Sequence, residues 1–324
     1  MRSRSAATTD RAMPHGPSAL APWPSQAMPL PALRGTMTIT ATPTSAAMQP
    51  TLLTDVPATA PERIAPDTWL IPNLAPAGPG QYLPVNSMVI RGREPVIVDT
   101  GAPMHRSQWL DKVFSVVEPE DVRWIFLSHD DGDHTGGLLD ALERCPNATL
   151  VTNWFSVERL ALEKPALPLH RMRWLEAGDR LDIGDRVLQL FRPPIFDGPT
   201  SRGLFDPKSG AMWIVDTFAC LTPGSLDADD LPQQMLAEMM PAFNSAVSPW
   251  HAWLDRATYG RHVDAVEAFG ATTVASAHGP VLRGERLDDA FDRLRSLAGA
   301  PIIPTPGQEL LDQLLAPTLV EATA

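Results

Sequence analysis

Two histidines and three aspartates lie within the stretch SHDDGDHTGG, which begins at Ser128. The apolar run WIFL precedes it, so these polar residues directly follow a segment with the composition of a buried strand. Imidazole and carboxylate groups are ligands that divalent first-row metals bind in proteins. The same composition would also suit a solvent-exposed acidic turn, and other parts of the sequence have to decide between these interpretations.

Further His and Asp residues follow other apolar segments. Asp99 follows PVIV, Asp216 follows MWIV, and His278 follows VASA. Loops at strand ends commonly carry metal-binding and catalytic residues, because the sheet fixes their positions. We therefore expect these residues to converge with those of the SHDDGDHTGG stretch at one edge of a sheet, which favours a metal site.

The order of these residues resembles the metal-binding pattern of the metallo-β-lactamase superfamily, usually written H-x-H-x-D-H. The matching residues here are His129, Asp131, Asp133 and His134, followed by Asp216 as the bridging aspartate and His278 as the last histidine. The turn DTG at Asp99 resembles the aspartate turn that supports the site in that family. The resemblance covers residues 66–283 and implies an α+β fold, the four-layer αββα metallo-β-lactamase sandwich.

Asp131 stands where the common pattern has a histidine. The flavodiiron proteins and their stand-alone oxygen-binding relatives place a carboxylate there, usually glutamate. Asp197, nineteen positions before Asp216, stands where that branch usually has another histidine. Oxygen ligands shift metal preference from zinc toward iron or manganese. Resemblance to this branch implies two metal ions, which we expect to be iron, with manganese and zinc as the alternatives.

The resemblance divides the ligands between two ions. One ion would be held by His129, Asp131, Asp197 and Asp216, and the other by Asp133, His134, Asp216 and His278. Asp133 and Asp216 are the expected catalytic residues. Two alternatives stay open: Asp131 as a hydrogen-bond acceptor for a ligand histidine, and Asp197 as an Asx-turn residue or a lost ligand.

We expect several other polar residues to support the ligands or to lie at the surface. We expect Asp99 to support a ligand rather than to bind metal, and His251 to pack a helix. Arg202 would either offset the excess carboxylates or grip an anionic substrate, or it lies on the surface. The remaining residues expected at the surface are Asp130, His105, His170 and His262.

Two functions are compatible with such a centre. The first is a di-iron protein that binds or reduces a small oxidant such as O2 or NO, with electrons from a separate electron-transfer protein. The second is a hydrolase, in which a metal-bridging hydroxide attacks an ester, lactone, amide or phosphodiester. A third interpretation is a non-catalytic relative that has lost one metal. We expect no FMN in this chain, because the residues after His278 lack a Gly/Ser/Thr-rich phosphate loop.

The amino-acid composition limits the classes of partner that we expect this chain to bind. The chain of 324 residues has a formal net charge of -12, which argues against nucleic acid or an anionic membrane as a partner. No apolar run reaches the roughly 18 residues of a membrane span. With only two cysteines, Cys145 and Cys220, a disulfide framework or a Cys-rich zinc site is disfavoured. We expect a cytoplasmic protein that acts on a small molecule, and the resemblance leaves a homodimer open.

The expected elements fit a layered sandwich. Residues 1–62 are dense in Pro, Ala, Ser and Thr, which predicts disorder. Residues 63–283 form the expected metal-binding domain, and 284–324 form a helical extension. Within the domain, strands are predicted at 68–74, 85–91, 94–101, 122–128, 149–153, 211–218 and 272–279, an antiparallel pair at 173–184 and 186–194, and helices around 109–117, 138–146 and 225–269.

Overall fold

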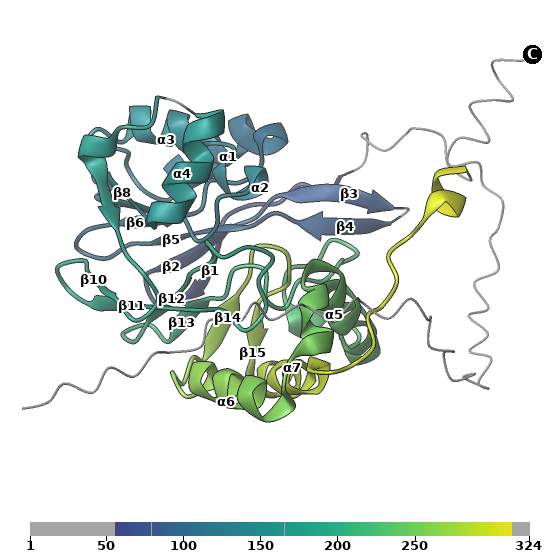
Figure 1. Ribbon diagram of the computed structural model, residues 1–324. Helices are drawn as coiled ribbons and strands as arrows, with labels where there is room; N and C mark the ends of the chain where they lie inside the picture. The colour runs from purple at the N-terminus through teal and green to yellow at the C-terminus, as the bar shows by residue number, and fades with distance from the viewer. Residues whose placement is uncertain (1–55, 79, 165, 313–324) are drawn as a thin grey trace, which may run out of the picture. The chain divides into compact units, whose positions relative to one another are not determined.

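The computed structural model describes residues 56–312 except 79 and 165. Most of the segment predicted to be disordered, and residues 313–324 of the predicted extension, lie outside the described residues. From Val56 onward the chain folds into two β-sheets packed face to face, with helices on both outer faces (Figure 1). The predicted four-layer αββα sandwich is therefore confirmed.

The first sheet has seven strands in the order β1-β2-β5-β6-β7-β8-β9. Strands β6 to β9 run parallel, and β1, β2 and β5 extend the sheet with antiparallel pairing. Parallel neighbours need long crossovers, and helices supply them here. The strands are β1 Glu62–Ala65, β2 Thr68–Ile71, β5 Ser87–Ile90, β6 Val96–Val98, β7 Trp124–Phe126, β8 Thr149–Thr152 and β9 Met172–Trp174.

Helices α1 Arg106–Phe114, α3 Leu138–Arg144 and α4 Trp154–Glu163 cover the outer face of this sheet (Figure 1). In β6, Ile97 faces these helices, whereas Val96 and Val98 face the second sheet. This alternation follows from the two-residue period of a strand. All three residues are buried because both faces of the strand are covered.

The second sheet has six strands in the order β10-β11-β12-β13-β14-β15, and only β13 and β14 pair in parallel. Helices α5 Gln233–Val247, α6 Arg256–Glu267 and α7 Gly284–Leu297 pack on its outer face. The side chains between the two sheets form a separate apolar core. The strands are β10 Arg180–Asp182, β11 Val187–Phe191, β12 Gly203–Asp206, β13 Ala211–Trp213, β14 Thr273–Ala275 and β15 Leu282–Arg283.

A two-stranded hairpin, β3 Leu74–Gly78 and β4 Gln81–Pro84, stands apart from both sheets. Tyr82 of β4 pairs with Thr222, which lies in the loop after β13. The hairpin matters for the site because β4 ends at Pro84, whose carbonyl contacts a histidine described below. None of the helices among the described residues has the length and apolar character required to cross a membrane.

Most predicted elements are present, with one misplacement and several omissions. The antiparallel pair β10–β11 is confirmed, but Arg173 and Trp174, which the prediction grouped with that pair, belong to β9 and join the first sheet beside β8. Helix α4 and strands β1, β3, β4, β12 and β15 were not predicted. The region 225–269 is helical as expected, and contains α5, α6 and two short 3-10 helices, η3 Ala228–Asp230 and η4 Pro249–Trp253.

Candidate metal centre

The predicted metal ligands come from four separate segments and meet at the strand ends of the two sheets. The loop after β7 and the short helix α2 Gly132–Thr135 carry the first four residues. Asp197 lies in the loop after β11, Asp216 follows β13, and His278 follows β14. All seven sequence-predicted residues, His129, Asp131, Asp133, His134, Asp197, Asp216 and His278, are joined by contacts between their side chains.

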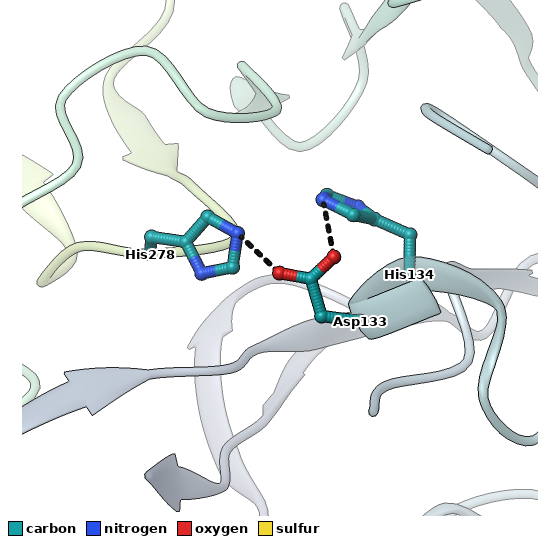
Figure 2. A group of neighbouring side chains, drawn as sticks. All are labelled: Asp133, His134 and His278. Carbon is teal, nitrogen blue, oxygen red and sulfur yellow. Dashed lines mark ion pairs between the residues drawn. The ribbon is translucent and has the colours of Figure 1, made fainter. Parts of the chain in front are cut away.

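One half of the centre, which we call the His278 half, consists of Asp133, His134, His278 and the shared Asp216. The Asp133 carboxylate lies between the two imidazoles (Figure 2), with Oδ2 at 3.2 Å from Nε2 of His278. Oδ1 of Asp216 lies 3.2 Å from Nε2 of His134 and 3.5 Å from Nε2 of His278. These spacings are short enough for one cation to be held between the groups.

The other half, which we call the His129 half, consists of His129, Asp131, Asp197 and the shared Asp216. Nε2 of His129 lies 2.8 Å from Oδ1 of Asp197 and 3.3 Å from Oδ2 of Asp131. Single donor atoms of His129, Asp197 and Asp216 all lie within 4.8 Å of one another. Asp216 therefore lies beside both halves, as a bridging ligand would.

Each histidine is held through its Nδ1 atom, so that Nε2 faces the centre. Nδ1 of His134 lies 2.9 Å from Oδ2 of Asp99, and Nδ1 of His278 lies 2.8 Å from the Pro84 carbonyl. Nδ1 of His129 lies 3.1 Å from Oγ1 of Thr200. Such partners fix the tautomer and the orientation of metal-binding histidines.

The backbone is strained where two of the aspartates are positioned. Asp99 has φ 59°, and Val215, directly before Asp216, has φ 60°. The left-handed region is unfavourable for a β-branched residue, at a cost of about 1–3 kcal/mol. Gly136 permits another close approach, since a Cβ atom there would lie 2.2 Å from the Pro103 nitrogen. The fold thus accepts unfavourable local geometry at this site.

The donor atoms fit a bound cation. Both carboxylate oxygens of Asp216 and Nε2 of His129 are buried, and among the described residues none has a directed hydrogen-bond partner. Their short contacts with neighbouring groups are therefore not aligned as hydrogen bonds. Burying an unsatisfied carboxylate is costly, and a metal ion relieves that cost. His and Asp donors at this spacing suit a divalent metal.

The pKa values of these side chains also indicate that the centre attracts positive charge. Burial alone would lower the pKa of His134, but the carboxylates of Asp216 and Asp99 raise it well above its ordinary value. Burial also opposes the charged form of His129, yet Asp131 and Asp197 raise its pKa to about 10. Burial would raise the pKa of Asp216, but His134 and its neighbours lower it to about 2. The side chains of the centre therefore favour positive charge.

Some supporting residues differ from their predictions. Asp130 is buried rather than exposed, because Thr200 and Arg159 bind its carboxylate. Arg202 is buried, and its guanidinium binds the carbonyls of Pro199 and Ser201 and pairs with the carboxylate of Glu176 rather than with a predicted ligand. His105, predicted at the surface, is buried against the Leu74 carbonyl.

Three predictions about other residues agree with the structure. Asp99 accepts hydrogen bonds from the Ser128 backbone nitrogen and hydroxyl as well as contacting His134, so it supports the centre. His251 is buried and bridges Ser245 of α5 and the Leu297 carbonyl at the end of α7, as a helix-packing residue would. His170 is exposed and His262 is partly exposed, as expected for residues at the surface.

Four contributors were not found from the sequence: Pro84, Arg159, Thr200 and Ser201. Thr200 and Ser201 contact Nδ1 of His129, and Arg159 contacts Asp130 and Asp131. Thr200 and Ser201 follow Asp197 closely, which was the only available signal. Arg159 lies on the unpredicted helix α4, and Pro84 acts through its backbone carbonyl, which no side-chain pattern reveals.

Comparison with known proteins identifies the family. A family model described as "ODP family beta lactamase" matches residues 83–279. Among curated proteins, the type A flavoprotein fprA of Rhodobacter capsulatus is 24% identical over 205 residues, which cover 63% of this chain and 46% of that protein. The chain spans less than half the length of the curated relatives it matches.

Solved structures share the fold. The rubredoxin oxygen:oxidoreductase of Desulfovibrio gigas aligns with a TM-score of 0.63 at 15% identity, covering 73% of this chain and 61% of that one. The flavodiiron protein of Giardia intestinalis aligns with a TM-score of 0.62 at 18% identity, covering 75% and 60%. Since the family model matches more than half of the sequence, this chain belongs to the ODP family of β-lactamase-fold proteins.

Proposed function

We propose that this chain holds a dinuclear metal centre, occupied by iron, that binds or reduces a small oxidant such as O2 or NO. The observation that carries the proposal is the position of Asp216 between two clusters of donors, with both carboxylate oxygens buried and lacking directed partners. A buried carboxylate between two sets of His and Asp donors suits a bridging role between two cations.

The donor set supports iron over zinc. The centre has four carboxylates, those of Asp131, Asp133, Asp197 and Asp216, and three imidazoles, those of His129, His134 and His278. Hard oxygen donors favour iron or manganese, and their negative charge favours a higher oxidation state. The names of the relatives, which include a flavodiiron protein and an oxygen oxidoreductase, support the same choice.

The residues of the chain would divide the work as follows. His129, Asp131 and Asp197 would hold one ion, Asp133, His134 and His278 the other, and Asp216 would bridge them. The bound ions would supply one-electron redox chemistry on the oxidant. Asp99, Pro84 and Thr200 keep the three Nε2 atoms facing the centre, so that no ligand has to reorient during turnover.

A separate electron-transfer protein would supply the electrons. Several relatives carry names of flavoproteins, and one solved neighbour is named as a rubredoxin oxygen:oxidoreductase.

Asp131 and Asp197 are the more accessible carboxylates of the His129 half, with side chains 40% and 35% exposed. Asp133 of the His278 half has a side chain that is 38% exposed, so a small oxidant would have access to both halves.

The proposal is tested with the full chain purified without added metal. We expect an optical spectrum of oxidised iron that bleaches on chemical reduction and returns when O2 or NO is consumed. Asp216→Asn should lose both the spectrum and the oxidant consumption, whereas Asp229→Asn, a change at an exposed carboxylate on η3, should retain both. Bound zinc with turnover of an ester or lactone would instead identify a hydrolase.

A further inference from the structure

We propose that Arg159 is a positioning residue that organises the His129 half of the centre; this inference rests on the proposed metal site. Arg159 projects from α4 and contacts two consecutive carboxylates of the motif. Its Nε lies 2.6 Å from Oδ2 of Asp130, and its Nη2 lies 3.2 Å from Oδ1 of Asp131. One guanidinium therefore joins a buried carboxylate and a half-exposed one.

The first effect is on Asp131 directly. Arg159 holds Oδ1, while Oδ2 lies 3.3 Å from Nε2 of His129 and faces the centre. The side chain of Asp131 is 40% exposed, so without this contact it could rotate toward solvent. Arg159 therefore presents Asp131 as a ligand with one available oxygen.

The second effect reaches His129 through Asp130 and Thr200. Oγ1 of Thr200 donates its only proton to Oδ1 of Asp130, at 2.6 Å. The same oxygen lies 3.1 Å from Nδ1 of His129 and can then act only as an acceptor. A protonated Nδ1 can donate to this oxygen and to Oγ of Ser201, which lies 3.3 Å away, and this tautomer leaves the lone pair of Nε2 free to bind a metal. Arg159 anchors the far oxygen of Asp130 and so fixes this chain of contacts.

The His278 half does not depend on Arg159. Asp99, which is fully buried, holds His134, and the backbone carbonyl of Pro84 holds His278. Both supports belong to the elements around the first sheet and the β3–β4 hairpin, not to α4. Loss of Arg159 should consequently weaken one half of the centre and spare the other.

The planar fork of arginine is essential to this role. Its Nη2 donates a hydrogen bond to Oδ1 of Asp131, and its Nε makes an ion-pair contact with Oδ2 of Asp130, so one rigid group contacts two separate carboxylates. A lysine would retain the charge but offers one compact ammonium group. If the fork matters, Arg159→Lys and Arg159→Gln should have similar effects. If Arg159 acts only through its positive charge, Arg159→Lys should bind both ions as the wild type does. Arg159→Gln should then bind them more tightly, because it removes a charge that repels the cations.

The experiment titrates the metal-free full chain with Mn²⁺ and follows free Mn²⁺ by electron paramagnetic resonance. The wild type should bind two ions. Arg159→Lys and Arg159→Gln should bind one ion as the wild type does, and the other about 10- to 100-fold more weakly. Arg295→Gln is the matched control, because Arg295 of α7 also contacts several carboxylates but lies on a different layer. Arg295→Gln should bind both ions with the affinities of the wild type.

Thr200→Val provides an independent variant that breaks only the route through His129. Thr200→Val should weaken the binding of the same single ion. It therefore tests the proposal even if the Arg159 variants fail to fold. The proposal would be overturned if the Arg159 variants bound both ions as the wild type does, or if Thr200→Val did so. It would also be overturned if Arg159→Lys bound both ions normally and only Arg159→Gln differed from the wild type. Failure of the wild type to bind two ions would instead contradict the dinuclear centre itself.

Discussion

The Asp99 carboxylate lies 2.9 Å from Nδ1 of His134 and also accepts two hydrogen bonds from Ser128. Asp99 is buried, and its φ of 59° places it in a strained conformation. The residue thus ties the end of β6 to the strand end of β7 and to a predicted metal ligand. This arrangement explains why an aspartate that does not face the donors should affect metal binding.

Asp99→Asn should weaken metal binding without abolishing folding. Asparagine retains one oxygen, so it can no longer accept from both Ser128 and Nδ1 of His134 in the same way. We expect metal affinity to fall about 10- to 100-fold. Competition with a chelator of known affinity measures this loss, with Asp140→Asn on the surface of α3 as the control. Equal affinities in the wild type and Asp99→Asn would contradict the supporting role of Asp99.

Asp131→His should change which metal is bound. An imidazole in place of the carboxylate makes the His129 half softer and less negative, which favours zinc over iron. The ratio of zinc to iron in protein from identical cultures should therefore rise relative to the wild type, as measured by elemental analysis. An unchanged ratio and content would mean that Asp131 does not bind the metal.

Metal removal should lower thermal stability. A ligand that binds only the folded state stabilises it by about 2.7 kcal/mol at a free concentration 100 times its Kd. The melting temperature should consequently fall on chelation and recover when metal is added. Asp216→Asn should melt at the same temperature with and without metal. A full metal-dependent shift in that variant would show that the ions bind elsewhere.

The two cysteines should be inert in the folded protein. Burial raises the pKa of both Cys145 and Cys220 to about 12, and both side chains are buried. A thiol reagent at pH 8 should therefore label neither residue until denaturant is added, and then label both. Rapid labelling of the native protein would contradict this environment.

The same shifts predict how stability depends on alkaline pH. The unfolded thiols release protons near their ordinary pKa of 9.0, whereas the folded thiols retain them up to about 12. The folded state therefore binds more protons in this range, so the free energy of unfolding decreases as pH rises above 9. Cys145→Ala should reduce the slope of that decrease, which denaturant titrations at several pH values can measure.

Arg186 should be important for stability rather than for metal binding. It is buried, and its guanidinium lies 3.0 Å from carboxylate oxygens of Asp206 and Asp67. Arg186→Met leaves the buried Asp206 without this partner, which should cost about 3–5 kcal/mol. Arg295→Met removes partly exposed ion pairs and should cost at most about 1 kcal/mol. Denaturant unfolding compares the two, and equal losses would contradict the account.

The sequence located the candidate ligands and Asp99 better than it located the other side chains that contact them. Asp99, Asp216 and His278 each follow an apolar strand, so strand periodicity and residue type were enough to place them at one edge. Arg159 and Asp130 could not be placed in this way. Their pairing depends on how α4 packs on the first sheet, and an aspartate within an acidic motif looks exposed until its buried partners are known.

The elements missed from the sequence are short or weakly patterned. Strand β15 has two residues, and β1 pairs along an edge with two exposed residues, so neither has a clear alternation. Arg173 and Trp174 looked like part of the following hairpin because they precede a turn, yet they pair in parallel with β8. Such pairing is a non-local property that local propensity does not encode.

The most direct test of the central claim is the metal content of the full chain and of Asp216→Asn, measured by elemental analysis on protein of known concentration. We predict two iron ions per wild-type chain and loss of both in Asp216→Asn, because Asp216 lies beside both sets of donors. One ion per wild-type chain, or two ions retained by Asp216→Asn, would contradict a dinuclear centre bridged by this carboxylate.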